Sequence, residues 1–128
     1  MKLNLKDGLA VKGFDVTEFF NGKAVEGSTN FLHLFENGTY KFASETNLEN
    51  FKSDPQKYLP QYGGYCAIAM SEGKLVDPNP KSFKIQDGKL YVFTRMFWGI
   101  IDVKRQWNKA PIEKRKLADS EWEVLKDA

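Results

Sequence analysis

The sequence has 128 residues, enough for one domain with its own hydrophobic core and no cross-links. Hydrophobic residues make up 41% and aromatic residues 14%, which excludes a disordered chain. Nineteen basic and seventeen acidic residues leave a net charge of +2, so we expect neither nucleic acid nor a membrane as a partner.

The single cysteine, Cys66, cannot form an internal disulfide, which fits a reducing compartment. No apolar run approaches the length of a membrane span, and residues 1–11 lack the core of a signal peptide. We therefore expect a cytoplasmic protein, or a periplasmic one if an export signal precedes this sequence.

The first third of the sequence predicts a strand, a short aromatic segment that packs into the core, and a hairpin. Residues 3–11 alternate loosely, as in a short strand or an extended arm. Three aromatic residues within 14–20 predict a loop or single helical turn that fills the core. Residues 31–35 and 39–42 are rich in β-forming residues and flank Asn37-Gly38, a pair typical of a type I′ hairpin turn.

A capped helix and a glycine bend come next. Ser44 is a typical N-cap, so we expect a helix over 45–52 with Leu48 and Phe51 buried, ended by Pro55. A helical turn over 56–59 then leads into Gln61 to Met70, which read Q-Y-G-G-Y-C-A-I-A-M.

Gly63 and Gly64 predict a sharp bend with positive φ directly before Cys66. Residues 65–71 are predicted as a helix, with a strand as the alternative. Two interpretations of Cys66 stay open, because a free cysteine commonly packs as a small hydrophobe, whereas its position also suits a chemical role.

The last third predicts a second hairpin and two helices. Residues 74–81 are expected to be a loop, and residues 82–93 form a hairpin around Asp87-Gly88. From Arg95 onward a helical period links Met96, Ile100, Val103 and Trp107. A final helix follows Pro111, and its buried stripe is Ala118, Trp122 and Leu125.

Together these elements predict a small α+β domain. Two β-hairpins form an antiparallel sheet, which is packed by short helices and by two C-terminal helices. We expect one domain over residues 1–128, with a core over 9–94 and the C-terminal helices over 95–126.

Several motifs stand in the order found in the YHS domain family. Residues 13–20 read G-F-D-V-T-E-F-F, where such proteins usually carry G-Y-D-P-V-A-Y-F, and F-A-S, D-P-Q-K-Y and Q-Y-G-G-Y-C-A follow at 42–44, 54–58 and 61–67. The sequence therefore resembles this family over nearly its whole length. The resemblance implies a small α+β domain, which in shorter relatives occurs beside copper-transporting ATPases and metal-dependent hydroxylases and carries metal-binding cysteines.

The sequence departs from the metal-bearing pattern at three positions. Ala43 and Asn47 stand in the region where such relatives have a pair of cysteines, and Thr17 stands where another would precede the first helix. The implied thiolate cluster is absent, so the chain is a variant without the metal-type cysteine pair.

The candidate site centres on Cys66. A thiolate and a thioether suit Cu(I), so Cys66, Met70 and His33 are the candidate ligands for a copper or zinc ion. A structural zinc site needs about four ligands, which these residues do not supply. His33 shares its strand face with Phe31 and Phe35, which favours a packed histidine. Tyr62 and Tyr65 are the candidate contacts for a small ligand.

Three functions from different classes are compatible with the sequence. The first is a YHS-type binding domain for a metal ion or a small ligand near Cys66. The second is a thiol-based redox or sensor protein, which needs a lowered thiol pKa. The third is a protein interaction module that uses Phe97, Trp98 and Trp107. No catalytic motif is recognisable, so we name no enzymatic activity, and the oligomeric state stays open, with a homodimer among the alternatives.

Overall fold

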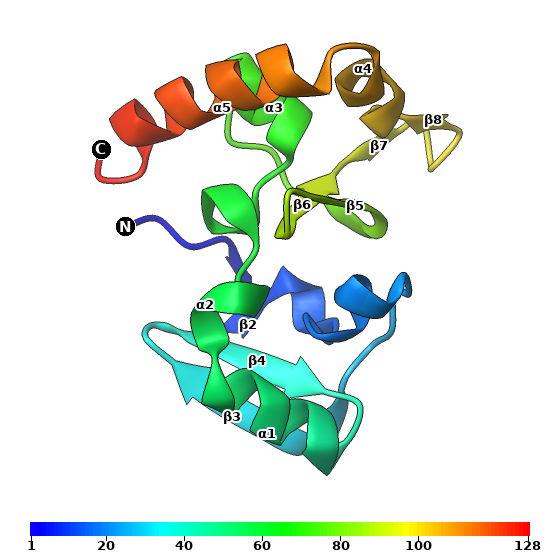
Figure 1. Ribbon diagram of the computed structural model, residues 1–128, viewed down its shortest axis with the longest axis vertical. Coiled ribbons are helices and arrows are strands. Elements are labelled where there is room, and N and C mark those ends of the chain that lie inside the picture. Colours follow the sequence, from blue (N-terminus) through cyan, green and yellow to red (C-terminus); the bar gives the residue numbers. More distant parts are fainter.

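The chain folds around strand β6 (Lys89–Phe93), which is buried on both faces. Successive side chains of a strand point to opposite faces, so its alternating residues enter two different clusters. Leu90 and Val92 belong to a first cluster, and Tyr91 and Phe93 belong to a second. The computed structural model describes residues 1–128, and the elements that carry the first and second clusters form the lower and upper parts of Figure 1.

The first cluster is formed by a four-stranded sheet and the helices beside it. From one edge to the other the strands are β1 (Leu5–Lys6), β2 (Leu9–Ala10), β4 (Gly38–Phe42) and β3 (Ser28–Phe35). Strands β2 and β4 are parallel, whereas the other neighbours are antiparallel. Phe51 is fully buried here, with its ring 5.0 Å from that of Tyr40 and 5.1 Å from that of Phe42. The other elements of this part are η1 (Val11–Gly13), η2 (Glu18–Asn21), α1 (Glu45–Ser53) and α2 (Pro55–Tyr58).

The second cluster lies under the C-terminal helices. Trp107 is fully buried against Tyr91 and Phe93, and its Nε1 donates a hydrogen bond to Gln86 Oε1 at 2.9 Å. Its elements are η3 (Gln61–Gly64), α3 (Ala67–Ser71), α4 (Lys104–Lys109) and α5 (Pro111–Leu125). A membrane-spanning helix is missing from the fold, because every helix falls short in length or in hydropathy.

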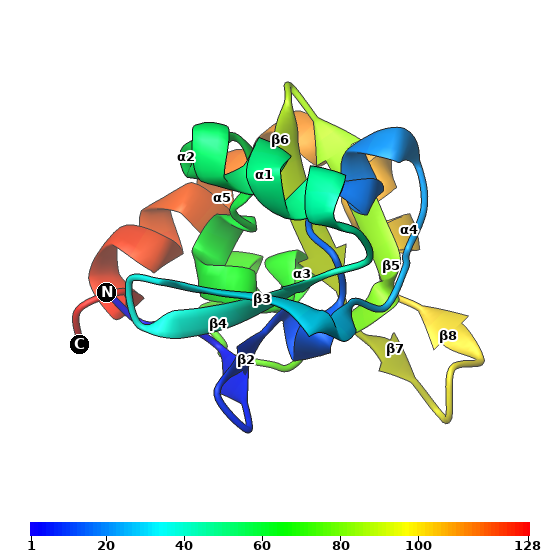
Figure 2. The same ribbon diagram turned by 90° about the horizontal axis from the view of Figure 1, so that it is seen from below.

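The α+β class is confirmed, but the two predicted hairpins do not share one antiparallel sheet. Strand β5 (Asn79–Gln86) and β6 form a separate two-stranded sheet, and an isolated bridge between Pro60 and Leu90 connects β6 with the segment after α2. Besides β3, strand β4 pairs with β2, which the turn Asp7-Gly8 connects to β1. Figure 2 shows β5 and β6 running across the direction of β3 and β4.

The two predicted hairpin turns have different outcomes. Asp87 and Gly88 connect β5 to β6 with φ of +51° and +74°, as a type I′ turn requires. In the first hairpin the turn residues are Glu36 and Asn37, and Gly38 is already paired in β4. A Cβ at Gly38 would lie 2.7 Å from Leu3 Cδ2, so a larger residue there would require the end of the Leu3 side chain to move.

The helix predicted to begin at Arg95 is wrong. Strands β7 (Arg95–Met96) and β8 (Ile101–Asp102) form a third hairpin, and helical structure begins only at α4. Phe97, Trp98 and Gly99 have φ of +54°, +56° and +89°, which an α-helix does not allow. The apolar residues at helical spacing therefore divide between an exposed hairpin and a buried helix.

The other predicted elements are present, some with different bounds or pairing. Residues 3–11 form two paired strands, β1 and β2, in place of one strand or arm, and α3 begins at Ala67, so Tyr65 and Cys66 precede the helix predicted over 65–71. Phe51 is buried as predicted, whereas Leu48 is half-buried.

Ser44 Oγ accepts a hydrogen bond from the Asn47 N–H at 3.1 Å and caps α1. Ala118 is buried and Trp122 and Leu125 pack against the second cluster, which confirms the stripe on α5. Strand β5 begins at Asn79, inside the segment predicted as a loop.

Candidate functional site

The glycine bend before Cys66 is confirmed, and it begins one residue earlier than predicted. Tyr62, Gly63 and Gly64 have φ of +58°, +62° and +84°. A Cβ at Gly63 would lie 2.4 Å from the backbone oxygen of Lys2, which runs alongside. The bend therefore needs glycine both for its conformation and for the close approach of the N-terminal segment.

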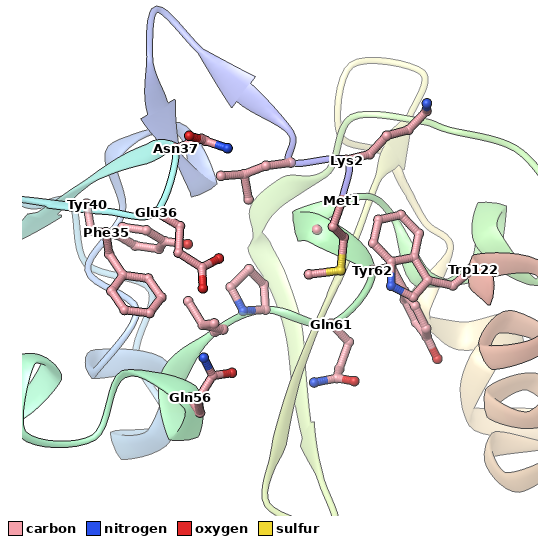
Figure 3. Close-up of a pocket in the computed structure, with 14 residues that line it drawn as sticks. Met1, Lys2, Phe35, Glu36, Asn37, Tyr40, Gln56, Gln61, Tyr62 and Trp122 are labelled. Carbon is pink, nitrogen blue, oxygen red and sulfur yellow. The ribbon is translucent and has the colours of Figure 1, made fainter. Parts of the chain in front are cut away.

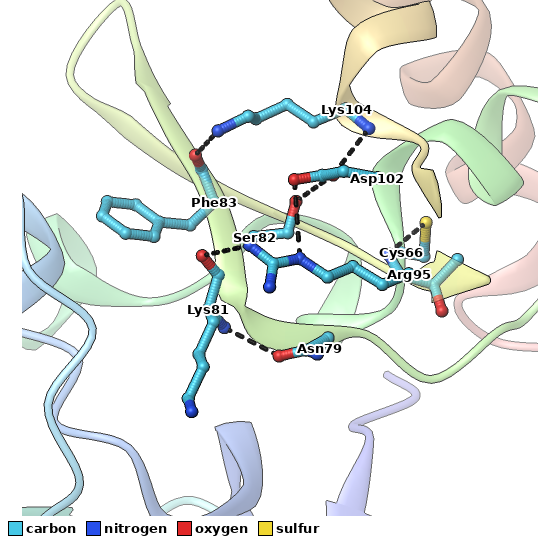
Figure 4. A network of polar contacts seen from close by, with 9 residues as sticks. Cys66, Asn79, Lys81, Ser82, Phe83, Arg95, Asp102 and Lys104 are labelled. Carbon is cyan, nitrogen blue, oxygen red and sulfur yellow. Dashed lines mark hydrogen bonds and ion pairs between the residues drawn. The ribbon is translucent and has the colours of Figure 1, made fainter. Parts of the chain in front are cut away.

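The bend places Cys66 inside the second cluster. The residue is fully buried, and its Sγ accepts a hydrogen bond from the Thr94 N–H at 3.2 Å (Figure 4). Burial raises the pKa of the Cys66 thiol, because the low-dielectric interior disfavours the thiolate. A reactive cysteine needs a lowered pKa and access to solvent, so this environment argues against a nucleophilic or redox-sensing role.

The structure brings together two of the three predicted metal ligands. Cys66 and Met70 lie in the second cluster, and both are fully buried. His33 is half-buried on β3 beside the first cluster, with its ring edge-on to Phe51 at 6.1 Å, as its strand pattern favoured. No group of three or more His, Cys, Asp or Glu side chains that could hold a metal ion is present. A copper or zinc site at Cys66 stays a prediction, and metal analysis of the purified protein would test it.

The three positions that depart from the metal-bearing pattern lie around one buried carboxylate, Asp15. Its Oδ1 accepts hydrogen bonds from the Thr17 N–H at 2.9 Å and the Thr17 hydroxyl at 2.7 Å. Its Oδ2 accepts from the Ala43 N–H and from Asn47 Nδ2, both at 2.8 Å. With four donors in place, the carboxylate ties the segment before η2 to the end of β4 and to α1.

The sequence pattern did not indicate Asp15 as the centre of this network. The local signal is its spacing from Thr17, since an Asp side chain often accepts a hydrogen bond from the amide two residues later. The contacts with Ala43 and Asn47 span 28 and 32 residues, so they depend on tertiary structure.

A cavity of about 250 Å³ lies beside the glycine bend, between the turn of the first hairpin and α5 (Figure 3). Tyr62 lines it, as predicted for a ligand contact, whereas Tyr65 packs against the second cluster instead. Cys66 lines neither of the two main cavities. The lining residues are Met1, Lys2, Leu3, Phe35, Glu36, Asn37, Tyr40, Gln56, Leu59, Pro60, Gln61, Tyr62, Gly63 and Trp122.

Tyr62 is held rigidly in the wall of this cavity. Its hydroxyl donates a hydrogen bond to Asp119 Oδ1 on α5 at 2.7 Å, and its ring lies edge-on to Trp122 at 6.4 Å. Burial, followed by the hydrogen bond to Asp119, raises the pKa of Tyr62 far above its usual range. The phenol therefore stays neutral and serves as an apolar wall with its polar end already engaged.

Five other polar side chains of the cavity have no hydrogen-bond partner inside the protein. The Tyr40 hydroxyl makes no hydrogen bond, and burial, with a smaller effect of Glu36, raises the pKa of Tyr40 to about 12. The side chains of Glu36, Asn37, Gln56 and Gln61 likewise form no hydrogen bond within the protein, although all of them line the cavity. The cavity thus combines aromatic walls with a set of polar groups that are free to bind a ligand.

Comparisons of the chain with family models, with curated proteins and with solved structures gave no significant match. The resemblance to the YHS family therefore stays a prediction from its motifs.

We predict that Cys66 of the folded protein reacts with iodoacetamide at neutral pH at least about tenfold slower than free cysteine, because burial raises the pKa of its thiol and shields the sulfur from the reagent. The rate should increase only at alkaline pH or after unfolding in urea. A Ser120→Cys variant places a second thiol on the exposed side of α5 and should gain one fast-reacting group. Rapid modification of Cys66 in the native wild type would contradict this environment.

We predict that Asp15→Ala lowers the free energy of unfolding by about 3 kcal/mol, because it leaves several donors without an acceptor in the interior. Urea denaturation followed by circular dichroism measures this change. Asp77→Ala is the matched control, since Asp77 is exposed and makes no hydrogen bond within the protein, and it should have little effect. A loss below about 1 kcal/mol for Asp15→Ala would show that the network contributes little.

Proposed function

We propose that the protein is a YHS-type binding domain that holds a small organic ligand in the cavity beside Tyr62. The observation that carries this proposal is the pairing of aromatic walls with polar side chains that have no partner in the protein. Exposed amides are usually satisfied by water, but here several of them surround one concave, partly aromatic surface. Such surfaces are the common form of small-molecule sites.

The size and chemistry of the cavity define the ligand class. About 250 Å³ is slightly less than the range typical of drug-sized ligands, so the ligand is small. Phe35, Tyr40, Tyr62 and Trp122 offer ring faces and edges, which favours a flat, aromatic ligand.

Charge further restricts the ligand. Figure 3 shows the Glu36 carboxylate directed toward the hollow and the Lys2 ammonium directed away from it. The amides of Gln56 and Gln61 provide both donors and acceptors. We therefore propose a neutral or cationic nitrogen heterocycle whose ring stacks on the aromatic residues while its polar edge binds the amides.

A site at Cys66 itself is supported less well. The thiol is buried, it already accepts a hydrogen bond, and a metal would require its deprotonated form. The cavity, in contrast, has lining groups that are available without any rearrangement of the core.

The test is a thermal-shift screen of small nitrogen heterocycles, followed by calorimetry on compounds that raise the melting temperature. Gln61→Trp should fill the cavity and weaken binding of such a compound by at least about tenfold, because its ring occupies the space of the ligand. Gln106→Trp is the matched control, since Gln106 is exposed on α4 and does not line the cavity. Equal binding by both variants, or no binding compound for the wild type, would contradict the proposal.

A further inference from the structure

The β7–β8 hairpin projects from the body of the protein and carries an exposed apolar tip. Figure 2 shows it extending away from the sheets and helices, and its closing turn has an Ile100 N–H that donates to the Phe97 backbone oxygen at 3.2 Å. Trp98 is 98% exposed, Ile100 is 81% exposed and Phe97 is 60% exposed. Soluble domains expose single apolar residues commonly, but rarely several large ones at one point.

The base of the hairpin is rigid, so the tip is presented in a defined direction. Arg95 Nε lies 3.5 Å from Asp102 Oδ2, which bridges the two strands. Asp102 also accepts hydrogen bonds from the Ser82 hydroxyl and from the Lys104 N–H (Figure 4). The hairpin is thereby anchored to β5 and to the start of α4.

Positive charge is concentrated in the part of the chain that carries this tip. Residues 79–109 contain seven basic and two acidic residues, whereas the rest of the chain contains twelve basic and fifteen acidic residues. The surplus includes the exposed side chains of Lys81, whose backbone oxygen accepts a hydrogen bond from Arg95 Nη2 of β7, and of Arg105, which follows the end of β8 by three residues. The nearly balanced net charge of the whole chain therefore conceals a basic segment.

We propose that this tip inserts into the interfacial region of an anionic lipid bilayer. Tryptophan and phenylalanine favour the headgroup level of a membrane, and isoleucine extends the apolar contact below it. A projecting, convex tip suits a deformable bilayer, and the basic residues behind it attract anionic headgroups. Stacking on nucleic-acid bases is a poorer fit, because Met96, Ile100 and Ile101 are not aromatic. The inference departs from the expectation drawn from net charge alone.

The test uses the full chain with vesicles of phosphatidylcholine alone and of equimolar phosphatidylcholine and phosphatidylserine. We expect cosedimentation with the anionic vesicles, and weaker binding to the neutral ones or in high salt. Tryptophan emission should shift to shorter wavelength on binding. Trp107 is fully buried and Trp122 packs against the second cluster, so Trp98 is the indole that leaves water.

Variants separate the apolar and the electrostatic contributions. Trp98→Ser combined with Ile100→Ser should weaken vesicle binding by at least about tenfold, since burial of these side chains supplies the apolar contact. Ile112→Ser combined with Val124→Ser removes exposed apolar residues from α5 and should leave binding unchanged. Each of Lys81→Gln and Arg105→Gln should weaken binding by about fivefold.

Three results would overturn the inference. The first is an absence of binding to anionic vesicles, and the second is equal binding by the wild type and the Trp98→Ser, Ile100→Ser variant. The third is self-association in sedimentation velocity that this variant abolishes while vesicles are not bound, because that result would assign the tip to a second copy of the chain. Circular dichroism should be unchanged in every variant, as all the substituted side chains are exposed.

Discussion

The burial of strand β6 on both faces is the constraint on which the rest of the structure depends. A strand covered on one side needs one apolar layer, but the run of Leu90, Tyr91, Val92 and Phe93 requires two. The β-sheet with α1 and α2 supplies one layer, and the helices α3, α4 and α5 supply the other. The Asp87-Gly88 turn sets the register of β6, so it determines which residues enter which cluster.

The candidate ligand site follows from this two-sided arrangement. The cavity lies where the hairpin turn of the first cluster approaches η3 and α5 of the second, so its wall combines Tyr40 and Glu36 with Tyr62 and Trp122. Neither cluster alone would form it. The Asp15 network contributes indirectly, because it joins the end of β4 to α1 and so stabilises the sheet that carries Tyr40. The β7–β8 tip is a separate feature, since it belongs to the basic segment 79–109 and does not line the cavity.

Local signals predicted most of the elements, whereas long-range contacts determined the features that were missed. The Ser44 cap, the glycine bend and the Asp87-Gly88 turn each depend on a few adjacent residues, and all three are confirmed. The pairing of β2 with β4 and the packing of Leu3 against Gly38 involve residues distant in sequence, so no local pattern predicts them. The helix predicted from Arg95 was wrong because apolar residues at helical spacing also arise when exposed residues of a hairpin precede a buried helix. Tyr62 was the one predicted site residue that lines the cavity. The polar side chains around it come from distant parts of the sequence, so only the folded structure shows that they lie together without a hydrogen-bond partner in the protein.

Native-state hydrogen exchange tests most directly whether β6 unites the two clusters into one folding unit. If it does, the slowest amides of β4, β6 and α3 should exchange with the same free energy, equal to that of global unfolding, and should share one dependence on denaturant. Exchange of the α3 amides at a clearly lower free energy than those of β4 would contradict the account, because the second cluster would then open while the first remains folded.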